Sequence, residues 1–462
     1  MVVWLGVLGC EPDAIPLDPD VAVDSTAAPS DGPTWYADVA PIIGLRCAGC
    51  HVAGDIAAFR PFGTYAETAP WAGSIAAAVV GELPGVVRMP PYQAAESDDC
   101  AFAYPLEHDN ALSDDEIAVL RAWAEAGAPE GDPATAASVP EPITPTLPDG
   151  IAYDNPADHA VAPTESGDQF YCFVIDPELT EDQFVTGFEV LADDRTIVHH
   201  ANIYVDYARE SLGWLADDAP VEHGPGWYAC GKEIIPGVMS GAYVPGSPPI
   251  RTPEGTAFAV PAGSLYVLQI HYYYADLTGD PKPDDTAIRV RYADDPTAFA
   301  GHPERIVRIT TPGNFTHPAP EGGTGIVVEP GEEAPYFSIP PHATAHREVM
   351  QYRMPGSPAD VYTYAITGNH MHQHGVEAVL RNLTTGECYV RTPDWSFEWQ
   401  MDYRFDATKA PLPVVHGGDL FELTCTFAND GDEPVLHGES STEEMCSFFL
   451  GVTGFVDTPP AR

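Results

Sequence analysis

From about residue 165 to Val456, the chain is a succession of short β-prone segments separated by Gly, Pro and Asp pairs. This region has no convincing long helical period. The whole chain of 462 residues holds 48 prolines and 41 glycines, which together make up nearly a fifth of it. Short apolar runs bounded by turn residues are typical of antiparallel strands. The pattern predicts two all-β antiparallel sandwiches, jelly-roll-like in type, over residues 165–305 and 306–462.

Residues 34–131 carry helical signals and predict a small all-α domain ahead of the sandwiches. A helix is expected from Tyr36 to Leu45, and Cys47-Ala48-Gly49-Cys50-His51 follows it directly. The C-x-x-C-H pattern attaches haem c through two thioethers, and its histidine ligates the iron. Further along, prolines hold Met89 on an extended loop, where its thioether can be the second axial ligand. A last helix begins with the capping box at residues 113–116.

The order of helix, C-x-x-C-H, Met-Pro loop and terminal helix resembles the cytochrome c family over this whole unit. The resemblance implies a haem c bound by Cys47, Cys50, His51 and Met89. Two alternatives stay open. Cys47 and Cys50 could instead form a disulfide or a zinc pair, and His108 lies in the same region as Met89 and could take its place as the iron ligand.

Two further segments are predicted to lack a folded core. Residues 1–33 open with an apolar stretch ending in Val7-Leu8-Gly9-Cys10, which resembles a bacterial lipobox whose cysteine carries a lipid. That stretch is short and no Lys or Arg precedes it, so either the true start lies upstream or the match is accidental. The rest of the segment, rich in Asp, Pro, Ala and Ser, is expected to be a disordered tether. Residues 132–164 predict a Pro-rich linker.

The net charge and the cysteines limit which partners the chain can bind and in which compartment it is expected. The formal net charge of −49 argues strongly against binding to nucleic acid or to anionic membrane surfaces. No apolar run is long enough to span a membrane, so contact with one is expected only through a lipid on Cys10. Nine cysteines indicate an oxidising compartment, and six remain for pairing if two bind haem and one a lipid. We therefore expect an exported protein of the bacterial cell envelope, either periplasmic or lipid-anchored at the outer membrane or cell surface.

The segment Gly368-Asn369-His370-Met371-His372 holds the strongest metal signal among the β-prone segments. Residues i and i+2 of a strand project from one face, so His370 and His372 can reach one ion, and imidazole suits copper or zinc. The alternative is a His-rich edge strand without metal. Met445 lies in Glu443-Glu444-Met445-Cys446, and a thioether favours Cu(I), although methionine is also an ordinary core residue.

Three other histidines fall in the first predicted sandwich. His199 and His200 are adjacent, so on a regular strand they point to opposite faces and can share a metal only at a bulge or twist. His271 comes late in the apolar run Leu265-Tyr266-Val267-Leu268-Gln269-Ile270, and an imidazole buried there needs a polar partner.

The order His-His, Leu-Gln-x-His-Tyr, His-x-His and Glu-Glu-Met-Cys resembles the copper type II, ascorbate-dependent monooxygenases, which include dopamine β-monooxygenase and peptidylglycine α-hydroxylating monooxygenase. The resemblance runs from Tyr171-Cys172 to near Val456. It implies an electron-transfer copper on His199, His200 and His271, and an oxygen-binding copper across a solvent-filled gap. It also implies a disulfide between Cys425 and Cys446, and it assigns no partner to the remaining cysteines. The implied catalytic residues are His370, His372 and Met445, which hold the oxygen-binding copper, and Gln269.

The implied activity is hydroxylation of an sp3 C–H bond of a small organic substrate with O2. Electrons would come from ascorbate, from the fused haem, or from an electron-donor protein. Peptide-amidating members hold a carboxylate with an Arg and a Tyr at the positions of Gly368 and Phe449, so a neutral or cationic substrate is favoured. Two other classes stay open: a non-catalytic cell-envelope electron-transfer or copper-binding protein, and a surface-binding sandwich whose histidines are structural.

Three aromatic residues and one histidine near these motifs have two interpretations each. Trp395, Phe397 and Trp399 belong to a run that resembles the dopamine-type branch, and they are either packing residues or part of a pocket wall. His374 is either a spare metal ligand or a residue that hydrogen-bonds beside the copper.

Overall fold

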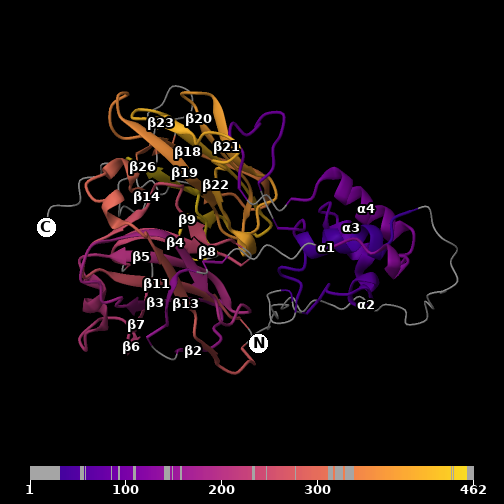
Figure 1. Cartoon of the computed structure of the whole chain (residues 1–462), viewed down its shortest axis with the longest axis horizontal. Coiled ribbons are helices and arrows are strands. Elements are labelled where there is room, and N and C mark those ends of the chain that lie inside the picture. Colours follow the sequence, from indigo (N-terminus) through magenta and orange to yellow (C-terminus); the bar gives the residue numbers. More distant parts are fainter. Residues whose placement is uncertain are drawn as a thin grey trace.

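The computed structural model describes residues 32–454 with some interruptions. The interruptions are 53–56, 58, 85, 92–93, 108–110, 140–145, 148, 157–158, 231–234, 246, 276, 311–315, 318–325, 328–337, 439 and 441. Most strands form two stacked bodies, and the helices lie to one side of them (Figure 1). Cys10 and His108, to which the sequence assigned a lipid and an alternative iron ligand, lie outside the described residues. In the described part of the chain, every helix is too short or too polar to cross a membrane.

The first sandwich contains two large antiparallel sheets and a two-stranded ribbon. Its strands are β1 (Ile151–Tyr153), β2 (His159–Val161), β3 (Asp168–Ile175), β4 (Gln183–Leu191), β5 (Val198–Asp206), β6 (His223–Gly224), β7 (Trp227–Ala229), β8 (Val238–Tyr243), β9 (Ile250–Arg251), β10 (Phe258–Val260), β11 (Leu265–Tyr273), β12 (Lys282–Asp284) and β13 (Ala287–Tyr292). One sheet has the order β1-β13-β4-β10 with β9 beside β4, and the other has the order β6-β7-β3-β11-β5-β8. Strand β12 pairs with β2. The described residues of this part also form the 3₁₀ turns η4 (Glu210–Leu215), η6 (Pro296–Ala298) and η7 (Pro303–Arg305).

Strand β11 shows why the apolar run of the sequence lies at the centre of its sheet. It pairs with β3 on one side and β5 on the other, and all but its last residue are buried. Alternate side chains belong to the core between the two sheets: Tyr266, Leu268, Ile270 and Tyr272. By the period of two, Gln269 and His271 face the opposite side of the sheet. One face of the strand therefore stabilises the sandwich, and the other carries polar groups.

The second sandwich repeats this plan with two large antiparallel sheets and a ribbon. Its elements are β14 (Val307–Thr310), β15 (Thr316–His317), β16 (Ile326–Val327), β17 (Ser338–Ile339), β18 (Ala343–Arg353), β19 (Val361–His370), β20 (Gly375–Asn382), β21 (Glu387–Thr392), η8 (Phe397–Trp399), β22 (Asp402–Arg404), β23 (Val414–His416), β24 (Leu420–Asn429), β25 (Val435–Leu436) and β26 (Ser447–Thr453). One sheet has the order β14-β26-β19-β22 with β23 beside β19, and the other has the order β16-β15-β18-β24-β20-β21. Strand β24 buries alternate residues throughout, as a strand with one core face should.

The two sandwiches share buried surface at their junction. Ile309 of β14 and Ile366 of β19, both from the second sandwich, belong to the same apolar cluster as Phe188 and Ile250 of the first. Burial of one such side chain contributes roughly 1.5–3 kcal/mol. This contact holds the two sandwiches against each other and positions the site described below.

The N-terminal part contains short helices around a small core of its own. The helices are η1 (Trp35–Val39), α1 (Ala40–Arg46), α2 (Tyr65–Thr68), η2 (Ala69–Trp71), α3 (Ala72–Ala78), α4 (Asp114–Glu125) and η3 (Pro133–Thr135). Helix α4 begins at the predicted capping box, in which the Ser113 side chain accepts from the Glu116 amide and the Glu116 side chain accepts from the Ser113 amide. Trp35, Ile43, Leu120 and Trp123 are buried together.

The predicted fold class, a small all-α cytochrome c-like domain followed by two sandwiches, is wrong. The chain is mostly β, with 38% of residues in strands and 15% in helices, and no sizeable all-α N-terminal domain is present among the described residues. The four α-helices of the N-terminal part are only 4 to 12 residues long. The C-x-x-C-H and capping-box patterns mark where helices end or begin, but they do not determine how much helix lies between them. Residues 94–107, between α3 and α4, instead run onto the second sandwich.

Six of the described cysteines form three disulfides. The pairs are Cys100–Cys388, Cys172–Cys230 and Cys425–Cys446. The pairing of Cys425 with Cys446, implied by the family resemblance, is confirmed. Cys47 and Cys50 lie outside the three pairs, so the disulfide alternative for them is not observed. The predicted domain boundaries stay predictions, although β1 and β2 already pair within the first sandwich.

Candidate metal centres

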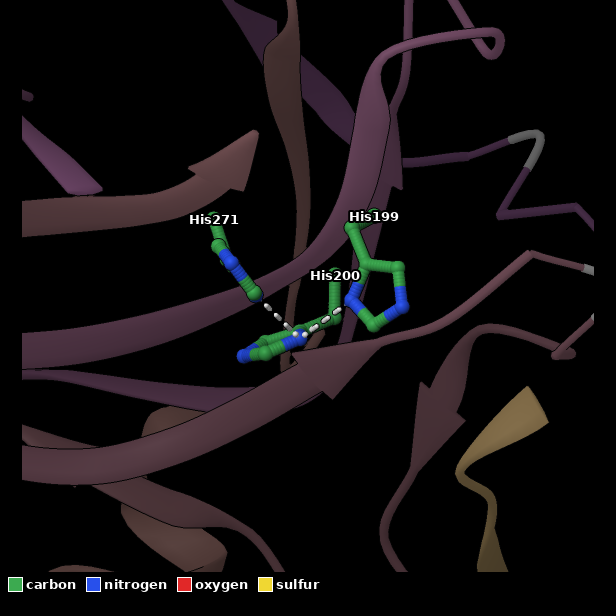
Figure 2. Close-up of side chains that lie close together, drawn as sticks. All are labelled: His199, His200 and His271. Carbon is green, nitrogen blue, oxygen red and sulfur yellow. Dashed lines mark hydrogen bonds between the residues drawn. The ribbon is translucent and has the colours of Figure 1, made fainter. Parts of the chain in front are cut away.

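The first cluster consists of three imidazoles on two neighbouring strands. His271 of β11 lies opposite His200 of β5, and the register then shifts so that Tyr272 lies opposite Val198. His199 therefore occupies the bulge that two adjacent histidines need if both are to reach one ion. The Nδ1 atom of His200 lies 3.1 Å from that of His199 and 3.3 Å from that of His271, and Figure 2 shows His200 between the other two rings.

The donor set of this cluster fits a metal cation. One nitrogen from each of the three rings lies within 4.8 Å of the others. The Nε2–H of His271 donates to Asp168 Oδ1 at 2.9 Å, which leaves its Nδ1 lone pair directed at the cluster. Burial and the neighbouring imidazoles of His271 and His199 hold the pKa of His200 well below its usual value. Three imidazoles whose nitrogens converge are the ligands that copper or zinc binds.

The second cluster lies at the end of β19 and in the turn before β20. The rings of His370 and His372 are 5.1 Å apart. The Nδ1–H of His370 donates to Gln400 Oε1 at 2.6 Å, and the Nδ1–H of His372 donates to the Glu443 carbonyl at 3.1 Å. Burial lowers the pKa of His372 to about 4. With Nδ1 as the donor, the lone pair of each ring lies on Nε2.

Glu444 organises the backbone around this second cluster. Its buried carboxylate accepts hydrogen bonds from the backbone N–H groups of His372 at 2.8 Å, His374 at 2.6 Å and Met445 at 3.1 Å. Burial raises the pKa of Glu444 to about 7, although these donors act in the opposite direction. The sequence pattern contained this residue only as part of a motif. The structure shows that it joins the His-x-His turn to the segment that carries Met445.

A short segment before β22 contacts both clusters. Phe397 stacks on His199 with ring centroids 4.5 Å apart and presents its edge to His372 at 6.1 Å. The Trp395 indole donates to the His372 carbonyl at 3.0 Å, and Gln400 accepts from His370. Phe397 also lines the cavity described next. Phe397 is therefore both a packing residue and part of the pocket wall. The Nδ1 of His374 bonds to the Ala428 carbonyl instead.

Both clusters line one cavity of about 230 Å³ between the sandwiches. The family resemblance implied two centres across a solvent-filled gap, and that arrangement stays a prediction; the structure shows histidines of both clusters on one cavity, with Phe397 at its wall. Met445 lines the same cavity, as does Gln269, whose Oε1 accepts from Asn202 at 3.0 Å. The structure therefore brings the following sequence-predicted residues together: His200, His271, His370, His372, Met445 and Gln269.

The predicted haem residues lie apart, in the helical N-terminal part. Cys47 and Cys50 are half-buried in a turn after α1, and burial raises the pKa of the Cys47 thiol to about 12. His51 donates from Nδ1 to the Arg60 carbonyl at 2.8 Å and stacks on Phe62. Two thiols outside disulfides and a histidine anchored through Nδ1 fit thioether attachment and axial ligation. Met89 follows α3, and its amide donates to the Ala78 carbonyl.

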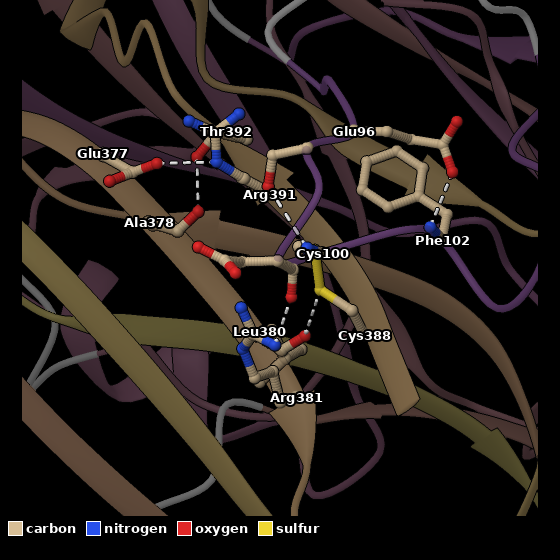
Figure 3. The surroundings of a disulfide bond; sticks show 12 residues. Glu96, Cys100, Phe102, Glu377, Ala378, Leu380, Arg381, Cys388, Arg391 and Thr392 are labelled. Carbon is tan, nitrogen blue, oxygen red and sulfur yellow. Dashed lines mark hydrogen bonds and ion pairs between the residues drawn. A yellow bond between two sulfur atoms is a disulfide. The ribbon is translucent and has the colours of Figure 1, made fainter. Parts of the chain in front are cut away.

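A strap formed by residues 94–107 fastens this part to the second sandwich. Cys100 is disulfide-bonded to Cys388 of β21, and the Arg381 side chain donates to the Asp99 carbonyl at 2.7 Å (Figure 3). At its far end, the Glu107 carboxylate accepts from Arg404 Nε of β22 at 2.9 Å. Arg404 also lines the cavity. The strap therefore runs from the helical part to the cavity wall.

The fold and the site define a class: a protein of two antiparallel sandwiches whose histidine clusters, one with a methionine beside it, face one cavity. Residues 327–452 match the family model described as the copper type II ascorbate-dependent monooxygenase, C-terminal domain. This range contains His370, His372 and Met445. The match supports the copper type II ascorbate-dependent monooxygenase family, and that family implies a copper-dependent oxidoreductase acting with O2 on an organic substrate.

The comparisons with curated proteins and with solved structures do not bear on the function. None of the curated proteins matches the chain. Similar solved structures include oxalate decarboxylase from Bacillus subtilis, studied for its Mn(II) centres, and an oxalate decarboxylase studied for its substrate-binding mode. Each is 9% identical, covers 69% of this chain and 85% of its own, and has a TM-score of 0.13. Similarity that low does not establish a common fold.

Proposed function

We propose that the chain is a copper monooxygenase that hydroxylates an sp3 C–H bond of a small organic substrate. The observation that carries the proposal is that two members of a three-imidazole cluster, His200 and His271, and a His-His-Met set from the other sandwich line one cavity. The cavity has room for a small organic molecule, and most of its wall is apolar. The net reaction consumes the C–H compound, O2, two electrons and two protons, and it yields an alcohol and water.

In this proposal His199, His200 and His271 hold one copper, and His370, His372 and Met445 hold the other. Bound copper supplies one-electron transfers and the activation of O2. The chain's own residues prepare the ligands for this role. Asp168 fixes the ring of His271, and Gln400 fixes that of His370. Phe397 and apolar side chains form much of the wall between the clusters.

The electrons come from ascorbate, the reductant named in the matched family, or through a haem c attached to Cys47 and Cys50. His51 is the proposed axial ligand on one side of the iron and Met89 on the other. The strap supports this route because it fixes the helical part to the second sandwich, so that a haem there stays close to the copper domains. An electron-donor protein would then reduce the haem.

The proposed location is the bacterial cell envelope, with a lipid on Cys10 as the proposed anchor. Three disulfides support an oxidising compartment, since such bonds are rare in the reducing cytosol. Mass spectrometry of the mature protein would test both parts of this proposal.

The test is metal content followed by turnover, on protein made in a periplasm with haem-attachment machinery. We expect two coppers and one iron per chain, and O2 uptake with ascorbate that depends on an organic substrate. His372→Ala should remove one copper and abolish product. His374→Ala is the matched control, because His374 neighbours the site but bonds to the Ala428 carbonyl. Two bound coppers without any hydroxylated product across a broad substrate panel would favour an electron-transfer protein instead.

A further inference from the structure

The wall of the cavity contains one carboxylate that the chemistry of the histidines does not use. Asp402 of β22 lines the cavity, and its backbone pairs with that of Gly368 on β19. A Cβ atom on Gly368 would lie 2.7 Å from Asp402 Oδ1, closer than such atoms approach. The glycine therefore leaves the space that this carboxylate occupies.

The cation nearest to Asp402 on its own strand is already engaged. Arg404 donates from Nε to Glu107 Oε2 at 2.9 Å and from Nη1 to the Pro249 carbonyl. Its charge is thereby offset by Glu107, and its guanidinium is held between the strap and the first sandwich. Arg404 lowers the pKa of Asp402 only through the space between them, without a hydrogen bond.

The Asp402 carboxylate accepts no hydrogen bond from any residue in the described part of the chain. Burial is the largest influence on it and raises the pKa of its carboxyl to about 7. The neighbouring cavity wall is apolar, with Ile250, Ile366 and Phe449. A half-buried carboxylate without a hydrogen-bond donor is poorly solvated, and a positively charged ligand would offset that cost.

We propose that Asp402 is the specificity-determining residue of the cavity, and that it binds the ammonium group of a small organic amine with an apolar body. The ammonium donates to the carboxylate, and the apolar body lies along Ile250, Ile366 and Phe449. One of its C–H bonds then points towards the His370, His372 and Met445 side of the same cavity. The reaction of that C–H bond rests on the proposed function, whereas binding of the amine does not require copper.

An anionic substrate is the competing choice, with Arg404 as its partner. It would have to compete with Glu107 for the guanidinium and would lie beside the Asp402 carboxylate. Like charges at that distance in a partly buried site repel each other. The geometry therefore favours the cation.

The test is calorimetric titration of the full-length, copper-free, disulfide-intact protein with three ligands that share a six-carbon ring. The ligands are cyclohexylmethylamine, cyclohexylmethanol and cyclohexanecarboxylate. We expect the amine to bind about tenfold more tightly than the alcohol, and the carboxylate to bind most weakly. Asp402→Asn should reduce the affinity for the amine to that for the alcohol.

Two further variants separate this site from general attraction by the acidic surface. Asp430 is exposed on the second sandwich, so Asp430→Asn removes the same charge away from the cavity and should leave the amine affinity unchanged. Gly368→Ala keeps the charge but displaces the carboxylate, and it should weaken amine binding alone. Work at 0.15 M salt screens distant charges over about 8 Å.

The inference is overturned if the wild-type protein binds the amine and the alcohol equally, if Asp402→Asn retains the amine affinity, or if the carboxylate binds most tightly. Its failure differs from failure of the proposed function. Amine binding without hydroxylation by the copper-loaded protein would refute the monooxygenase alone. Hydroxylation of a neutral substrate that Asp402→Asn does not affect would refute the amine site alone.

Discussion

The two histidine clusters face the same cavity but are built in different ways. The first cluster depends on strand register, because a bulge brings His199 to the same side as His200 and His271. The Asp168 carboxylate supports this cluster by accepting a hydrogen bond from His271. A network of hydrogen bonds holds the second, with Gln400 and a backbone carbonyl on the rings and Glu444 on the turn. The first centre should therefore depend on the sheet itself, and the second on residues distant in the sequence.

Loss of a ligand should have the largest effect and should be equal at the two centres. His200→Ala and His370→Ala each remove one of the imidazoles that face the cavity. We expect each variant to lose one copper and to form product about 100-fold more slowly or worse, because neither centre can replace the other. Copper per chain and product per minute measure this. If His200→Ala protein with one copper turned over at the wild-type rate, a role for the first centre in the reaction would be refuted.

Removal of the supporting groups should reveal the difference between the centres. In Glu444→Gln an amide replaces the acceptor of three backbone N–H groups, and we expect copper at the second centre to bind about 10- to 100-fold more weakly. In Asp168→Asn the hydrogen bond from His271 weakens, so about tenfold or less is expected at the first centre. Competition with a copper chelator measures both affinities. Equal losses at the two centres would show that the contrast in construction has no energetic counterpart.

A third comparison concerns stability, between the disulfide of the strap and a disulfide within the first sandwich. The Cys100–Cys388 disulfide spans a sequence separation of 288, whereas Cys172–Cys230 spans 58 and stays within the first sandwich. Cys100→Ser should cost roughly 2–5 kcal/mol of stability and loosen the second sandwich first. Cys172→Ser, the matched control, should affect the first. Thermal unfolding followed by hydrogen exchange of β21 and β11 separates the two effects. Protection of β21 that is unchanged in Cys100→Ser would contradict a structural role for the strap.

The sequence predicted the β-rich character of most of the chain better than the N-terminal fold. Period-two patterns and turn residues are local, so strands such as β11 and β24 could be recognised directly. The bulge at His199 was predicted only as a requirement, because register depends on the partner strand. The C-x-x-C-H and capping-box patterns were equally local, but the extent of an all-α domain around them depends on packing that these patterns do not encode.

The residues that the sequence missed act over long separations. Glu444 bonds to backbone groups about 70 residues away, and Arg404 joins Glu107 to Pro249. Asp402 carries no motif, and its importance follows only from its place on the cavity wall opposite a glycine. Such contacts are decided by tertiary structure, so one sequence alone gives no signal for them.

Asp402 should also make the stability depend on pH. Burial raises the pKa of its carboxyl from 3.8 to about 7, so the folded state holds a proton that the unfolded state releases between those values. Its contribution to stability is therefore greatest at low pH and is lost as the pH rises from about 4 through about 7. Arg404 on the same strand is the charged group that acts on it, and Glu107 on the strap and Arg251 on β9 act in turn on Arg404.

Asp402→Asn removes this titration, and the result can be read in the copper-free protein without any substrate. Denaturant midpoints at pH 5 and pH 8 should differ less in the variant than in the wild type, with the variant the more stable of the two at pH 8. Asp430→Asn, on the surface, should keep the wild-type difference. A variant that is less stable than the wild type at pH 8 would show that the ionised carboxylate has a partner within the protein. The space beside Gly368 would then serve the fold and not a ligand.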